Sequence, residues 1–255
     1  EQGTGIVHIC PVHGMDDFIL GKKHNLELPM TIDEGGIYYE HIPLFKGKHI
    51  FKVDQDVCDE IKNCGNLISQ GQLVHSYPHS WRSKAPLVYK NTSQWFISME
   101  TNDLRKKAIN AIDQTDFFPK QGQNRLRSMI LDRPDWCVSR QRVWGVPLPI
   151  FVNKKTGEPL RDNIVIERIA KIYEEEGGDA WFNSDPSRFL SPEYENSDYE
   201  QVKDVVEVWF DSGSTHSYVL EKREDLHWPA SMYLEGSDQH RGWFHSSLLE
   251  SCGTR

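Results

Sequence analysis

The sequence predicts an α/β fold with a parallel sheet, and three observations support this. From His75 onward, short apolar runs typical of buried strands alternate with segments of helical spacing. That alternation is the pattern of strands joined by crossover helices. Hydrophobic residues make up 38% and charged residues 26% of the 255 positions, a composition typical of a globular chain. No apolar run approaches the roughly 18 residues of a membrane span, so we expect no membrane partner.

The first 74 residues are expected to contain short strands and Gly-rich turns around two helices. Their apolar residues alternate or recur at helical spacing, and Gly residues follow where a turn or a helix end is needed. The expected elements are, in order, a strand at Gly5–Ile9, a helix at Asp16–His24, a turn at Gly35-Gly36 and a helix at Val57–Cys64 that Gly65 ends.

The remaining residues carry the alternating strand and helix pattern, with one interruption. The expected elements are strands at Gln94–Met99 and Trp136–Ser139 and helices at Asp103–Ile112, Gln121–Leu131 and Ile164–Glu176. Residues 153–204 are acidic and contain Gly177-Gly178, Pro186 and Pro192. We interpret them as an inserted subdomain, after which the sheet pattern resumes near Val206.

The net charge is −9, but the basic residues are concentrated in one segment. Residues 75–150 carry 12 Lys or Arg and 6 Asp or Glu, whereas the other parts of the chain are net acidic. A basic surface of this kind can bind nucleic-acid phosphates. A solvated charged face is the commoner cause of such a pattern, so a nucleic-acid partner is permitted and not indicated.

Five cysteines, at positions 10, 58, 64, 137 and 252, include no CxxC pair. An odd number without pairing motifs argues against a disulfide framework or a zinc knuckle and favours a reducing compartment. We therefore expect no bound zinc and a cytoplasmic location.

Two segments near the end of the chain combine aromatic residues with turns that suit a nucleotide. In Tyr233–Phe244, an apolar run enters Glu-Gly-Ser-Asp, and we expect a strand that ends at Glu235. Ligands bind at the carboxyl ends of parallel strands, and a Gly-Ser turn lets backbone N–H groups approach them. An ordinary turn with capping Ser and Asp fits equally well. In Val208–His216, Trp209 either walls an apolar pocket or is a core residue ahead of a helix N-cap.

Two further segments carry chemistry-bearing side chains. In Asp135–Pro149, Arg140 and Arg142 flank a Gln at a strand end, where guanidinium groups would hold phosphate or RNA, or else form surface ion pairs. Residues 3–18 contain two His and two Asp. They would form a metal site or an acid/base pair, or a carboxylate among them would bind a substrate ammonium group. Their spacing matches no standard zinc pattern. Helix capping and a structural His explain them as well.

Four segments together are far more specific than any one of them. They are SYPHSWRSKAPL (Ser76–Leu87), DWCVSRQRVWGVPLP (Asp135–Pro149), VWFDSGSTH (Val208–His216) and YLEGSDQHRGWF (Tyr233–Phe244). With these segments in this order, the chain resembles the bacterial-type isoleucyl-tRNA synthetases, a family of class I aminoacyl-tRNA synthetases, over essentially all 255 residues. The valine and leucine relatives have different equivalents of WFDSGSTH and GSDQHRGWF, so the isoleucine family fits best.

The resemblance implies a fold made from parts of two domains. One is a class I Rossmann-type parallel-sheet catalytic domain, and the other is the C-terminal part of a mainly β editing domain. Residues 1–74 would belong to the editing domain, 75–152 and 205–255 to the Rossmann domain, and 153–204 to an inserted acidic subdomain.

The resemblance also implies roles for particular residues. Isoleucyl-adenylate would lie against the turn after residue 234, and indole rings would shape the pocket for the isoleucine side chain. These adenylate-site residues are Glu235, Gly236, Asp238, Gln239, Trp209 and Trp243. In the editing segment, Asp17 would bind the α-ammonium group of the misattached amino acid, and His8 would position the ester.

The implied activity is ATP-dependent activation of isoleucine, transfer to tRNA(Ile), and hydrolytic editing of valyl-tRNA(Ile). MgATP, isoleucine and tRNA(Ile) would be the substrates and partners of a monomeric enzyme. The sequence contains no HIGH and no KMSKS segment, which this family places before and after the region. We therefore assign no catalytic residue for activation and expect an internal fragment that is inactive in activation alone.

Two alternatives from other functional classes remain open at this point. One is a metal-dependent hydrolase that uses His8, His13, Asp16 and Asp17. The other is a non-catalytic RNA-binding module that uses the basic residues 75–150.

Overall fold

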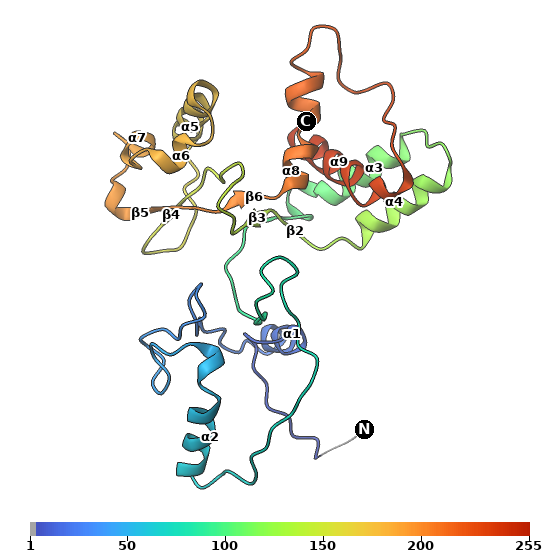
Figure 1. Cartoon of the computed structure of the whole chain (residues 1–255). Helices are drawn as coiled ribbons and strands as arrows, with labels where there is room; N and C mark the ends of the chain where they lie inside the picture. Colours follow the sequence, from blue (N-terminus) through green and yellow to red (C-terminus); the bar gives the residue numbers. More distant parts are fainter. Residues whose placement is uncertain (1–3) are drawn as a thin grey trace. The chain divides into compact units, whose positions relative to one another are not determined.

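The computed structural model describes residues 4–255 and divides the chain after Ser93 into two compact units (Figure 1). The first unit contains α1 (Met15–Lys23), a 3-10 turn (Ile50–Lys52) and α2 (Asp54–Asn63). Asp16 and Asp17 lie in the first turn of α1, and two lysines lie in its last turn. These charges stabilise the helix because they interact favourably with its dipole. Both helices were expected from the sequence, and the structure confirms them.

One glycine ends α2 and another closes a turn between α1 and α2, as predicted. Gly65 has a φ of +73°, its N–H donates to the Lys62 carbonyl at 2.9 Å, and Asn66 N–H donates to the Ile61 carbonyl at 3.0 Å. These bonds form a Schellman motif, which explains why the helix stops there. Gly36, with a φ of +76°, closes a turn that brings Ile32 and Tyr38 into a β-bridge.

The predicted strand at Gly5–Ile9 is wrong. This segment has no regular structure, and Ile6 and Val7 are 88% and 74% exposed. Within residues 4–255 no strand pairs with it, and an apolar run of this length becomes a strand only where a neighbour supplies hydrogen bonds.

Residues just before Ser93 pack on the first unit. The His13 ring bonds to the Tyr89 carbonyl through Nδ1 at 2.8 Å, and Lys90 Nζ lies 2.5 Å from the Glu34 carboxylate. The boundary between the compact units therefore comes later in the chain than residue 74.

Three helices form the core of the second unit. They are α3 (Leu104–Asp113), α4 (Gln121–Leu131) and α9 (Trp243–Thr254). The buried side chains between them include Met99, Ile112, Ile130 and Leu249. The first two helices occupy the predicted ranges. Among residues 4–255 no helix combines the length and the apolar character needed to cross a bilayer.

The described strands pair in twos, and every pair is antiparallel. The pairs are β1 (Phe96–Ile97) with β2 (Trp136–Cys137), β3 (Ser139–Arg140) with β6 (Val205–Val206), and β4 (Phe151–Asn153) with β5 (Tyr199–Gln201). The parallel pairing expected from the sequence is therefore not found between these strands. Two helices, rather than one, connect β1 to β2, so the chain returns in the opposite direction.

The interrupting acidic segment has a core of its own. It contains α5 (Asn163–Glu176), α6 (Ala180–Asn183), α7 (Ser187–Leu190) and β5, and the preceding β4 pairs with β5 and adds Phe151 to this core. Trp181 is fully buried, with its ring 4.9 Å from that of Phe151 and 5.1 Å from that of Phe189. Helix α5 confirms the prediction, and Asp162 caps it by accepting from Ile164 N–H at 2.8 Å.

Candidate functional site

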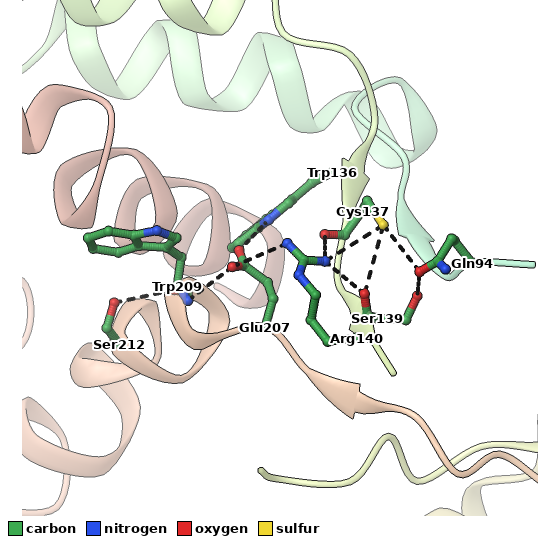
Figure 2. A network of polar contacts seen from close by, with 8 residues as sticks. All are labelled: Gln94, Trp136, Cys137, Ser139, Arg140, Glu207, Trp209 and Ser212. Carbon is green, nitrogen blue, oxygen red and sulfur yellow. Dashed lines mark hydrogen bonds and ion pairs between the residues drawn. The ribbon is translucent and has the colours of Figure 1, made fainter. Parts of the chain in front are cut away.

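A buried carboxylate, Glu207, fixes the helix that carries Trp209 (Figure 2). Glu207 caps α8 (Val208–Gly213) and accepts from Trp209 N–H at 3.3 Å. Its Oε1 accepts from the Trp136 indole N–H on β2 at 2.8 Å. Arg140 Nη2 lies 3.6 Å from Oε2, the oxygen that accepts from Trp209. Trp209 is therefore held at the first turn of α8, beside the strands β2 and β3.

Arg140, for which phosphate binding and a surface ion pair both remained open, has structural partners (Figure 2). Arg140 donates to the carbonyls of Cys137 at 3.0 Å and Ser139 at 2.7 Å and pairs with Glu207. Its neighbour Arg142 is exposed, and Trp144 is 90% exposed. A contact with RNA in this segment would therefore involve Arg142 and Trp144 before Arg140.

Trp243, at the start of α9, is held by contacts on its backbone, its indole nitrogen and its ring face. Its backbone N–H donates to Gln239 Oε1 at 3.0 Å, and its indole N–H donates to the Ser212 carbonyl of α8 at 3.0 Å. The Tyr233 ring stacks on it at 4.1 Å between centroids. The second tryptophan of the predicted site is thus linked directly to the helix of the first.

Gly242 is the point at which Trp209, Gln239 and Trp243 come together. A Cβ at this position would lie 2.7 Å from Gln239 Oε1 and 2.9 Å from Trp209 Cη2. Both distances are shorter than real side-chain contacts allow, so only a glycine fits without moving the indole and the amide. Three of the six residues predicted for the adenylate site therefore meet at one point.

The other three predicted residues lie on an exposed turn. Glu235, Gly236 and Asp238 are exposed, and Glu235 makes no hydrogen bond or ion pair with residues 4–255. Asp238 accepts from the Gln239 side chain at 3.1 Å. The strand predicted to end at Glu235 is wrong, because no strand of the described chain pairs with residues 232–235. No hydrogen bond within residues 4–255 joins the exposed Glu235 to either indole, whereas Tyr233, two residues earlier, stacks on Trp243.

A second buried carboxylate, Glu250 of α9, joins α9 to the end of α8. It is 8% exposed, and its Oε2 lies 2.8 Å from the Ser214 hydroxyl. Burial raises the pKa of Glu250 to about 8, with a smaller contribution from the nearby Asp211 and Glu207 charges. The carboxyl group is therefore mostly protonated at neutral pH.

In the first unit, no hydrogen bond or ion pair of the described residues joins the two residues predicted for editing, His8 and Asp17. Asp17 Oδ2 accepts from Cys10 N–H at 2.9 Å, whereas His8 is exposed. His13 bonds to the Tyr89 carbonyl and lies 3.3 Å from the Thr31 hydroxyl. Both nitrogens of His13 thus have structural partners, and residues 4–255 contain no group of three His, Cys, Asp or Glu arranged for a metal. These contacts give the metal-dependent hydrolase alternative no support.

Reasoning from the sequence missed the two buried carboxylates and His245. Glu207 stands directly before the VWFDSG run, at the N-cap position of α8. If a helix had been predicted to begin at Val208, Glu207 would have been identified as its capping residue. Glu250 and His245 carry no local signal, because only tertiary packing buries them.

The matching family model is described as tRNA synthetases class I (I, L, M and V), and it covers residues 22–255. The chain is similar to the isoleucine–tRNA ligase of Pelagibacter ubique, with 64% identity over 255 residues, 100% of this chain and 28% of that protein. Similar proteins of the same name occur in Gluconobacter oxydans (49% identity, 100% of this chain and 28% of that protein) and Idiomarina loihiensis (47%, 98% and 26%). The chain thus spans little more than a quarter of the length of the curated relatives it matches.

Proposed function

The chain belongs to the class I tRNA synthetase family of the isoleucine, leucine, methionine and valine enzymes, and on this premise we propose that it is a segment of an isoleucine–tRNA ligase. In the proposed reaction, the isoleucine carboxylate attacks the α-phosphorus of MgATP and releases pyrophosphate. The isoleucyl group then passes from the adenylate to the terminal ribose of tRNA(Ile). Positioning and charge stabilisation supply most of the rate in such a reaction, so no nucleophilic side chain is required.

The observation that carries the proposal is the meeting of Trp209, Gln239 and Trp243 at Gly242. The two indole rings would bound an apolar pocket for the isoleucine side chain, and Tyr233 and Ser212 hold one of them in place. Glu235, Gly236, Asp238 and Gln239 would contact the adenylate from the adjoining turn. Since Glu235 is exposed, its proposed role depends on the family resemblance and on closure of that turn over the ligand.

We assign residues 75–152 and 205–255 to the Rossmann catalytic domain, although residues 75–93 pack with the first compact unit, and 153–204 to its insertion. The separate aromatic core around Trp181 supports the insertion. The exposed Arg142 and Trp144 would contact tRNA. Residues 1–74 would belong to an editing domain, where Asp17 and His8 act on misattached valine.

The activation step is tested by isoleucine-dependent exchange of pyrophosphate into ATP with the full-length protein. We expect exchange with isoleucine and much weaker exchange with valine, because one methylene in an apolar pocket is worth about 1–3 kcal/mol, a value known for isoleucyl-tRNA synthetases themselves. Leucine and methionine are the matched comparisons. Exchange that proceeds equally with all four amino acids, or with none, would refute the proposal.

The editing role is tested by Asp17→Asn in the full-length protein. The amide oxygen can still accept from Cys10 N–H, so the loop is preserved while the charge that would bind an α-ammonium group is lost. We expect deacylation of valyl-tRNA(Ile) to fall by about 100-fold or more, since a charge-assisted bond is lost at the reacting group, with pyrophosphate exchange unchanged. Asp16→Asn, an exposed neighbour on the same turn, is the control. Equal losses of both activities would contradict the role.

A further inference from the structure

A small pocket is lined by Trp136 of β2, Trp209 of α8 and the first turn of α9. Its lining residues are Arg133, Trp136, Glu207, Trp209, Arg241, Gly242, His245 and Ser246, and its volume is about 90 Å³. That is several times the roughly 10–15 Å³ that one water molecule needs. The pocket therefore has room for a small polyatomic group.

Two lining residues each carry a buried nitrogen without a partner. His245 is 5% exposed, and its Nδ1 has no hydrogen-bond partner within residues 4–255. The same holds for Arg133 Nε. Arg133 Nη1 lies 3.2 Å from His245 Nε2. Because a guanidinium group only donates, Nε2 must accept, and the proton of a neutral ring then sits on Nδ1.

The imidazole of His245 is neutral at physiological pH, so its single ring proton is on Nδ1. Burial, followed by the charges of Arg133 and Arg241, lowers the pKa of His245 to about 4. Both unpartnered nitrogens are therefore N–H donors. A buried donor left without an acceptor costs about 1–3 kcal/mol, so an acceptor group at this position would be stabilising.

The charges around the pocket select the kind of acceptor. Arg133 and Arg241 are cationic, and the pocket lies at the N-terminal end of α9, where backbone N–H groups favour negative charge. The carboxylate of Glu207 is also in the lining. Its oxygens are occupied by Trp136 N–H at 2.8 Å, Trp209 N–H at 3.3 Å and Arg140 at 3.6 Å.

From these contacts we propose that the pocket bounded by Arg133, Arg241 and His245 binds a small oxyanion, with the size and charge of phosphate or a carboxylate. The oxyanion accepts from Arg133 Nε–H and His245 Nδ1–H and is attracted by both guanidinium groups. Trp209 and Gly242 line this pocket as well as the proposed amino-acid site, so the two sites adjoin. The proposal depends on the contacts of the pocket and not on the proposed ligase activity.

The test is equilibrium dialysis of the full-length protein against labelled inorganic phosphate, with thermal unfolding as a second readout. Both are done without amino acid, nucleotide or tRNA, so their result does not depend on the proposed function. Phosphate and acetate at concentrations well above their dissociation constants should raise the melting temperature by about 4 °C, as expected for a ligand that binds only the folded state. Chloride at equal ionic strength is the control for general effects of anions, because it is spherical and lacks the oxygen atoms of phosphate and acetate.

Three variants distinguish this site from general ion effects. His245→Phe keeps a buried ring and removes one donor, and Arg241→Gln removes an exposed charge that the fold does not require. We expect the affinity for phosphate to fall about tenfold and about fivefold, respectively. Arg125→Gln, an exposed charge on α4 outside the pocket, should leave it unchanged.

The outcomes separate clearly. Saturable binding of phosphate that Arg241→Gln weakens and Arg125→Gln does not would support the site, even if His245→Phe fails to fold. Equal stabilisation of all variants, equal stabilisation by chloride, or no binding of phosphate or acetate would overturn it.

Discussion

Gly242→Ala is expected to lower kcat/KM for isoleucine in pyrophosphate exchange by about 100-fold or more, since misplacement of a positioning group by about 1 Å has an effect of that size. The new methyl group would lie 2.7 Å from Gln239 Oε1 and 2.9 Å from Trp209 Cη2. It would displace the amide that holds Trp243 N–H and the indole that faces it. The expected effect depends on the proposed ligase function.

The matched control for this variant is Gly253→Ala. Gly253 also belongs to α9, and a Cβ there would meet Leu104 Cδ1 at 3.6 Å, an ordinary contact. We expect its exchange activity to equal that of the wild-type protein. Circular dichroism and the melting temperature would show that Gly242→Ala remains folded. Retention of activity within about threefold would mean that the two indoles do not shape the amino-acid pocket.

Gly213→Ala is expected to lower the free energy of unfolding by about 3 kcal/mol, at the upper end of the cost of overpacking a core. A Cβ at Gly213, the last residue of α8, would overlap the Glu250 carboxylate and lie 3.0 Å from the backbone carbon of Ser246. The carboxyl group can turn away only by breaking its bond to Ser214. Urea unfolding followed by far-UV circular dichroism measures the change.

A double-mutant cycle tests the stated cause. Glu250→Ala removes the group that the new methyl group would strike, so the double variant Gly213→Ala/Glu250→Ala should be destabilised by clearly less than the sum of the two single changes. Gly253→Ala is again the control, with an expected gain of roughly 0.5–1 kcal/mol from helix propensity. Strict additivity, or a Gly213→Ala protein as stable as the wild type, would exclude the clash as the cause.

Helices were predictable from the sequence because their signals are local. The apolar spacing of residues 104–113 and 163–176 and the Gly65 that follows α2 define each helix within its own residues. The strands were less predictable. Gly5–Ile9 and the run before Glu235 have strand-like composition, but the described chain provides no partner for either. Strand pairing is a tertiary property that composition alone does not report.

The candidate site was predictable in part for a related reason. Trp209, Gln239 and Trp243 were placed by their motifs, and the structure brings them together at Gly242. Glu235 was expected in the same cluster, yet it is exposed. Glu207, Glu250 and His245 became visible only in the structure, since a buried charge or imidazole depends on residues far away in the chain. Motif spacing identified the side chains that meet at Gly242 and did not identify the buried carboxylates that support them.

The buried Glu250 has a consequence for the energetics of folding. Its pKa rises from an ordinary value of 4.5 to about 8 when the chain folds, so between these values the unfolded chain is ionised at this residue while the native one is neutral. Folding in that interval takes up a proton at Glu250. By linkage, the contribution of this residue to stability is greatest at the acidic end, decreases as the pH rises, and stays constant above about 8. A rise in pH from about 4.5 to about 8 therefore weakens the junction between α8 and α9, the two helices that carry Trp209 and Trp243.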